Sequence, residues 1–133
     1  SILKKLNSVD KIKITGLNNK VEFERFNTAL SRLSDVTFNT IQCDLSGNQL
    51  TEIQFKQIND RLLSKMSRLT SLNLSDNYIE DAGAIVIAQS DYMKHLAMLD
   101  LGETDIGPEG AIAIAKSRHM KHLKSLKKSL VWR

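Results

Sequence analysis

The sequence predicts an α/β solenoid of about four stacked repeats, with a parallel sheet on its concave face and helices on its convex face. The first observation is an internal repeat: the residue pattern of segment 69–79 recurs at 96–106, and that of segment 80–90 recurs at 107–117. Both copies recur after 27 residues (96 − 69 and 107 − 80). The second observation is that the apolar period within each copy changes from alternation to helical spacing. Because one unit of this length cannot enclose a core, the copies must stack on one another.

The first two repeats, near residues 9–37 and 38–66, are looser copies of this unit. Ile12–Asn18 matches it with the asparagine one place late, and Cys43–Leu50 matches it 29 residues before the next copy (74 − 45). Each is followed by apolar residues at three- and four-residue steps, which predict a helix packed on the sheet. These residues are Phe23, Phe26, Leu30 and Leu33 in the first repeat and Ile58, Leu62 and Met66 in the second.

The third and fourth repeats, near residues 67–93 and 94–120, are the best-formed copies. Leu72–Leu74 and Leu99–Leu101 alternate apolar and polar residues, as a short strand with one buried face does. Their helices are short and built from alanine and isoleucine, namely Ile85, Ile87, Ile112 and Ile114. Gly83 and Gly110 predict a close approach between neighbouring backbones, and Pro108 fits the first turn of a helix.

A polar residue follows each predicted strand where the chain turns outward. In the second and third repeats it is Asn48 and Asn77. A buried side-chain amide there can satisfy backbone groups of neighbouring turns. In the fourth repeat it is Thr104, whose hydroxyl predicts a weaker connection.

The pattern breaks in the last segment, residues 121–133. Lys128 stands where the preceding copy has Leu101, and burying its charge is costly. We therefore expect the fifth strand to fail or stop early. Residues 123–130 then form an amphipathic cap over the last repeat, or the segment is a truncated repeat.

These residues resemble leucine-rich repeat proteins, whose pattern is L-x-x-L-x-L-x-x-N-x-L. The small residues in Asp81–Ala84 and Glu109–Ala111 are similar to those of the ribonuclease-inhibitor-like subfamily. The resemblance implies a segment of a right-handed α/β horseshoe. The length of 133 residues predicts a single domain over residues 1–133. It also implies functions such as inhibitor, small-GTPase regulator, immune receptor or bacterial effector.

The strand residues that alternate with buried leucines should face outward on the concave sheet. A broad, rigid, polar surface of this kind suits recognition of another protein better than an enclosed substrate pocket does. The sequence therefore predicts a non-enzymatic protein-interaction module, whose partner and oligomeric state it does not identify. The predicted partner-binding residues are Gln42, Asp44, Ser71, Asn73, Ser75, Asp76, Met98, Asp100 and Glu103. Their acidic centre favours a basic partner.

No catalytic residue, metal ligand or cofactor is predicted. Cys43 occupies an inward leucine position, so its thiol is interpreted as core filling rather than as a nucleophile. His95 and His122 recur at the same place in successive repeats, in a loop between helix and strand, without the neighbours that a metal site needs. The segment Gly107–Gly110 lacks the lysine of a phosphate-binding loop.

Charge concentrates at the end of the chain. The net charge is +4, but residues 116–133 carry seven basic and no acidic residues, which leaves −3 for the rest (4 − 7). Nucleic-acid binding through this segment, with Trp132 stacking on a base, is an alternative function, disfavoured because no aromatic residues interleave with the charges. Regulation of a small GTPase is another alternative function.

Composition sets the remaining expectations. No apolar run approaches the roughly 20 residues that span a bilayer, so no membrane partner is expected. The single cysteine suits a reducing compartment. We expect a cytoplasmic protein, or one that acts in a host-cell cytoplasm if it is a secreted bacterial effector.

Overall fold

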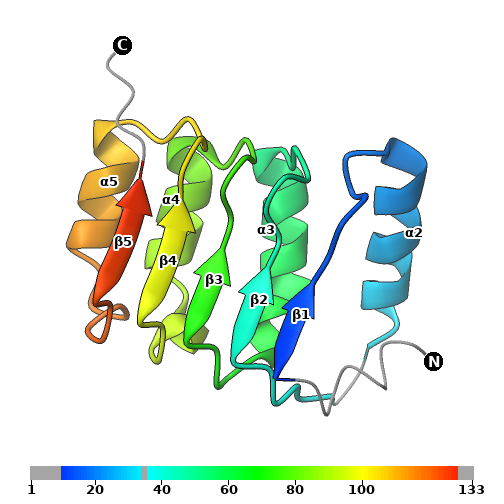
Figure 1. The fold of residues 1–133 in the computed structure, drawn as a ribbon, viewed down its shortest axis with the longest axis horizontal. Coiled ribbons are helices and arrows are strands. Elements are labelled where there is room, and N and C mark those ends of the chain that lie inside the picture. Colours follow the sequence, from blue (N-terminus) through cyan, green and yellow to red (C-terminus); the bar gives the residue numbers. More distant parts are fainter. Residues whose placement is uncertain (1–9, 34–35, 129–133) are drawn as a thin grey trace.

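The computed structural model describes residues 10–33 and 36–128. Strands and helices alternate along this part of the chain, which holds five strands and four α-helices (Figure 1). The strands are β1 (Lys11–Lys13), β2 (Gln42–Asp44), β3 (Ser71–Asn73), β4 (Met98–Leu101) and β5 (Ser125–Lys128). The helices are α2 (Lys20–Ser31), α3 (Glu52–Arg61), α4 (Glu80–Ala88) and α5 (Pro108–Ala115), with single 3-10 turns at Leu63–Lys65 and Asp91–Met93.

The sheet follows the order of the chain, β1-β2-β3-β4-β5, and every neighbouring pair is parallel. Parallel strands of this kind need crossover connections, which the helices supply. All four helices lie on one side of the sheet (Figure 1), so the other side has no second layer among the described residues. We call that side the open sheet face. The predicted α/β fold class is confirmed.

The core lies between the sheet and the helices and repeats with the chain. Inward strand residues stack in register: Cys43 pairs with Leu72, and Leu72 with Leu99. The second inward leucines, Leu45, Leu74 and Leu101, are fully buried. Helix residues close the layer from the other side, including Phe23, Phe55, Ile58, Ile87 and Ile114.

The turn asparagines form a ladder of hydrogen bonds between repeats, as predicted. Asn48 Oδ1 accepts from the N–H of Leu17 at 3.0 Å, and Asn77 Oδ1 accepts from the N–H of Leu50 at 2.9 Å. The Asn77 amide also donates to the Leu45 and Leu74 carbonyls, each at 3.0 Å. These buried amides satisfy backbone groups that the turns leave without partners.

Thr104 occupies the same place in the fourth repeat. Its hydroxyl donates to the Leu101 carbonyl of its own repeat at 2.6 Å. The connection to the preceding repeat runs through the backbone instead, from the N–H of Glu80 to the Thr104 carbonyl at 2.9 Å.

Helix α5 receives its N-terminal cap from the neighbouring repeat. Its own N-cap residue, Gly107, has no side chain, and Pro108 stands at the first helical position as predicted. Asp81 of α4 accepts from the N–H groups of Gly107 and Gly110 at 2.8 and 2.9 Å. A Cβ on Gly110 would lie 2.7 Å from that carboxylate oxygen and 2.9 Å from Ala84 Cβ. The predicted close approach at Gly110 is therefore confirmed.

Gly83 differs from this expectation. A Cβ there would lie 2.5 Å from Ile79 Cγ2 of its own repeat and 3.6 Å from Phe55 of the preceding one. The glycine makes room for a side chain of its own repeat, since the distance to the neighbouring helix is ordinary.

Replacing Asp81 with alanine is expected to lower the free energy of unfolding by about 1–3 kcal/mol, because two N–H groups at the start of α5 lose their acceptor. Asp81→Asn retains an acceptor oxygen and should cost less. Urea denaturation followed by circular dichroism measures both. Equal stability of Asp81→Ala and the original chain would contradict the capping role.

The expected failure of the fifth strand, and with it the amphipathic cap formed by residues 123–130, is wrong, whereas the truncated-repeat alternative stays a prediction. β5 forms and pairs with β4 over its whole length, with Lys128 opposite Leu101. The backbone of β4 offers hydrogen bonds whatever side chains follow, and β5 is the last strand of the sheet among the described residues, so no further strand lies along its outer edge. Lys128 is therefore only half-buried and Leu126 is 43% exposed. The charge is not desolvated as the sequence argument assumed.

Candidate functional site

The open sheet face carries two rows of side chains that run across the strands. The strand register places every residue of a row beside its counterpart in the next strand. The first row is Lys11, Gln42, Ser71, Met98 and Ser125, and the second row is Lys13, Asp44, Asn73, Asp100 and Lys127. Six of the nine predicted binding residues lie in these two rows.

The central residues of the second row are held by short turns. Asp44 Oδ1 accepts from the N–H of Ser46 at 2.9 Å. Asn73 Oδ1 accepts from the N–H of Ser75 at 3.0 Å, and Asp100 Oδ1 from the N–H of Gly102 at 3.0 Å. Each turn fixes a polar side chain and uses one of its oxygens. The other oxygen of each carboxylate makes no hydrogen bond among the described residues and can accept from outside.

Sequence reasoning did not predict that these side chains also hold the local turns. The available signal was the recurring pattern of Asp or Asn followed two residues later by Ser or Gly, which favours such turns. The predicted residue Ser75 belongs to the same turn, where its hydroxyl donates to Asn73 Oδ1 at 2.8 Å.

A shallow hollow of about 370 Å³ lies at the β1 end of the open sheet face. Its lining residues are Lys11, Ile12, Lys13, Gln42, Cys43, Asp44, Ser71 and Asn73. Cys43 is buried, and desolvation, with a smaller contribution from the charge of Asp44, raises the pKa of its thiol to about 12. The thiol is neutral core filling, as predicted, and the hollow presents amine and carboxyl groups rather than a nucleophile.

The remaining predicted residues, Asp76 and Glu103, lie in the turns at the edge of this face. Their φ angles are +58° and +53°, in the left-handed region that non-glycine residues rarely adopt. Gly47 occupies the equivalent turn of the second repeat with φ +71°. Glycine therefore fits this turn, and two acidic residues are retained at some cost in stability. Gln49, Glu80 and Asp105 also have a left-handed φ, so this strain recurs in the turns of the stack and is not confined to the predicted binding residues.

Replacing Glu103 with glycine is expected to raise the free energy of unfolding by about 0.5–1 kcal/mol, because the strain of a left-handed Glu is relieved. Glu24→Gly, within α2, is the matched control and should lower stability by about 1 kcal/mol. Thermal denaturation distinguishes the two. A loss of stability in Glu103→Gly comparable to that of the control would show that the turn does not strain Glu103.

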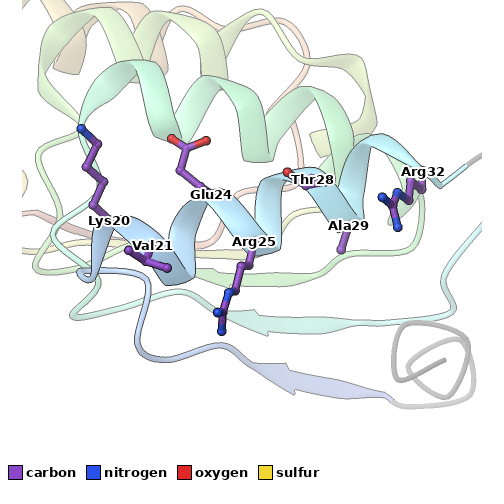
Figure 2. Close-up of a pocket in the computed structure, with 7 residues that line it drawn as sticks. All are labelled: Lys20, Val21, Glu24, Arg25, Thr28, Ala29 and Arg32. Atoms are coloured by element: carbon purple, nitrogen blue, oxygen red, sulfur yellow. The ribbon is translucent and has the colours of Figure 1, made fainter.

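Another hollow, of about 520 Å³, lies on the helical side (Figure 2). Six of its seven lining residues come from α2, and the seventh, Arg32, is the residue that follows this helix. Figure 2 shows them along one exposed surface of that helix. Among the described residues no opposing element closes this hollow, so it lacks the convergent polar groups of a substrate site.

Other candidate chemistry is dispersed. His95 and His122 are exposed in the loops before β4 and β5. Within residues 10–33 and 36–128, no three His, Cys, Asp or Glu side chains gather as a metal site would require. None of the helices in this part of the chain is long and apolar enough to cross a membrane.

The basic residues near the end of the chain follow α5 or lie in β5. Lys116, Arg118, Lys121, Lys124 and Lys127 are exposed. Trp132 and Arg133, which the nucleic-acid alternative invokes, lie outside the described residues.

Comparison with known proteins agrees with the geometry of the central repeats. A family model described as Leucine Rich repeat matches residues 66–88 and 92–115. The first match contains β3 and α4, and the second contains β4 and α5. Residues 66–115 are therefore leucine-rich repeats. A search of curated proteins finds no match.

Proposed function

We propose that this chain is a non-enzymatic protein-interaction module that binds its partner through the open sheet face. Leucine-rich-repeat domains generally mediate protein–protein interactions and are typically not catalytic. The observation that carries the proposal for this face is the pair of registered rows, which hold outward side chains on a rigid sheet. Met98, an apolar side chain that is 55% exposed between polar neighbours, supplies a contact that excludes water.

The finer assignment rests on the helices. The alanine- and glycine-rich segments of α4 and α5, with the tight contact of Gly110 on Asp81 and Ala84, support a ribonuclease-inhibitor-like repeat. Within that group we propose a regulatory protein, or a bacterial effector acting in a host-cell cytoplasm. The buried, neutral Cys43 thiol is compatible with that reducing compartment.

The test is affinity capture with a charge-reversed open sheet face. Asp44→Lys combined with Asp100→Lys is expected to reduce partner capture at least about tenfold, because two carboxylates near the centre of the face become cations. The matched control is Glu24→Lys with Glu109→Lys, which makes the same change of charge at exposed positions of α2 and α5. It should leave capture unchanged. Circular dichroism verifies that both variants fold.

Two results would contradict the proposal. One is full capture by the folded Asp44→Lys, Asp100→Lys variant. The other is an equal loss in both variants, which would show that net charge rather than the open sheet face decides binding.

The basic segment around β5 favours nucleic-acid binding as a second candidate function. Counterion release makes such binding depend steeply on salt. Lys121→Ser with Lys124→Ser removes two exposed cations and should weaken RNA or DNA binding and its salt dependence. Unchanged binding, or none by the original chain, would eliminate this candidate.

A further inference from the structure

The second row of the open sheet face has a charge pattern of its own. Read across the five strands, Lys13, Asp44, Asn73, Asp100 and Lys127 give basic, acidic, neutral, acidic and basic positions. The two lysines are exposed and the three central residues are half-buried. A ligand of uniform charge meets repulsion somewhere along this row. Nucleic acid, for example, brings phosphates onto Asp44 and Asp100.

The spacing of the row restricts the shape of the ligand. Neighbouring strands lie about 4.8 Å apart, which places the five positions over about 19 Å. An extended peptide repeats its side chains on one face every 6.6–6.8 Å or so and loses register with such a row. A helix rises about 1.5 Å per residue, so residues i, i+3, i+7, i+10 and i+14 lie on one face at about 0, 4.5, 10.5, 15 and 21 Å. A helix therefore follows the row.

We infer that the partner presents an α-helix that lies across the strands with an acidic, basic, polar, basic, acidic pattern at i, i+3, i+7, i+10 and i+14. The inference rests on the proposed function and specifies the partner of that same face. Basic residues at i+3 and i+10 meet the free carboxylate oxygens of Asp44 and Asp100, and acidic residues at the two ends meet Lys13 and Lys127. The polar residue at i+7 lies over Asn73.

The first row sets the direction of the helix. The charges of the second row read the same from either end, so they do not distinguish the two orientations. Met98 lies in β4, beside Asp100, and its counterpart beside Asp44 in β2 is the polar Gln42. An apolar partner side chain next to the basic residue that meets Asp100 covers Met98 and fixes the orientation.

The test uses two synthetic helices of equal composition. Each is an alanine-based peptide of about 20 residues, long enough for substantial helicity when capped. One carries Glu, Arg, Gln, Arg and Glu at the five positions, and the other carries Arg, Glu, Gln, Glu and Arg. Because their net charges are equal, non-specific attraction to the chain cancels, and only the position of the charges differs.

Titration of the labelled chain by amide NMR is expected to show at least about tenfold tighter binding of the first peptide at low salt, since four charge pairs change sign between the peptides. The shifts should fall on β2, β3 and β4. Asp44→Asn with Asp100→Asn should lower the preference to about threefold. Asparagine is the matched replacement because Asn73 makes the same turn in β3.

Equal binding of the two peptides would overturn the inference, as would shifts confined to the helices or no shifts at millimolar peptide. If partner capture is nevertheless lost in the Asp44→Lys, Asp100→Lys variant, only the helical partner is wrong and the open sheet face remains the site. If that variant captures the partner normally, the proposed function itself has failed.

Discussion

Replacing Leu74 with alanine is expected to lower the free energy of unfolding by about 2–5 kcal/mol, through lost transfer free energy and the cavity left behind. Leu74 is fully buried directly after β3, the central strand of the sheet, with a repeat on either side. Since stability in repeat proteins is a sum over units and their interfaces, damage to the central unit disrupts both neighbours. Urea denaturation followed by circular dichroism measures the change.

His95→Ala is the control for this experiment, because its side chain is exposed in a loop, and it should shift stability by less than about 0.5 kcal/mol. A change in Leu74→Ala as small as that of the control would mean that the leucine rows do not hold the solenoid together.

Asn77→Ala is expected to cost about 2–4 kcal/mol although it removes no apolar surface. The substitution leaves the N–H of Leu50 and the carbonyls of Leu45 and Leu74 without the amide that serves them. Buried polar groups that lose their partners each carry a desolvation penalty. Thermal and urea denaturation should show the same loss of stability, because the lost hydrogen bonds connect two repeats.

The neighbouring residue supplies the control. Tyr78 is 49% exposed, and Tyr78→Ala should cost much less than Asn77→Ala. If the two variants are equally stable, water replaces the ladder at little cost and the role given to the turn asparagines is wrong.

The repeat made most of the fold predictable. Leu72 and Leu99 recur at a fixed interval, and that interval also sets which residues pair in β3 and β4. Helical spacing predicted α2. Of the residues predicted to mark the second helix only Ile58 lies in α3, since Leu62 and Met66 follow its end. The turn asparagines predicted their ladder. Each of these features depends on the local residue pattern and on the similarity between successive repeats.

Features that depend on neighbouring repeats were less predictable. The cap on α5 comes from Asp81, 26 residues before Gly107, and no local sequence motif predicts it. The wrong prediction for β5 has a different cause. Sequence reasoning assigned the cost of burial to Lys128, whereas β5 is the last strand of the sheet among the described residues and the lysine there is only half-buried.

The candidate site was also predictable only in part. Alternation within the strands placed Asp44, Asn73 and Asp100 on the open sheet face, and the register brings them side by side. Their turns had a local sequence signal that was not used, whereas the left-handed φ of Glu103 required the three-dimensional structure, because backbone angles follow from the path of the chain around the stack. Their role in binding stays a prediction.

Photo-crosslinking tests the use of the open sheet face most directly. A photoreactive phenylalanine is placed at position 98 on β4, or at position 112 on α5, where Met98 and Ile112 are 55% and 51% exposed. The two sites are thus matched in exposure and apolar character and differ in the face they occupy. We predict that the captured partner crosslinks from position 98 and not from position 112. Crosslinking from position 112 alone would place the partner on the helices and contradict this account.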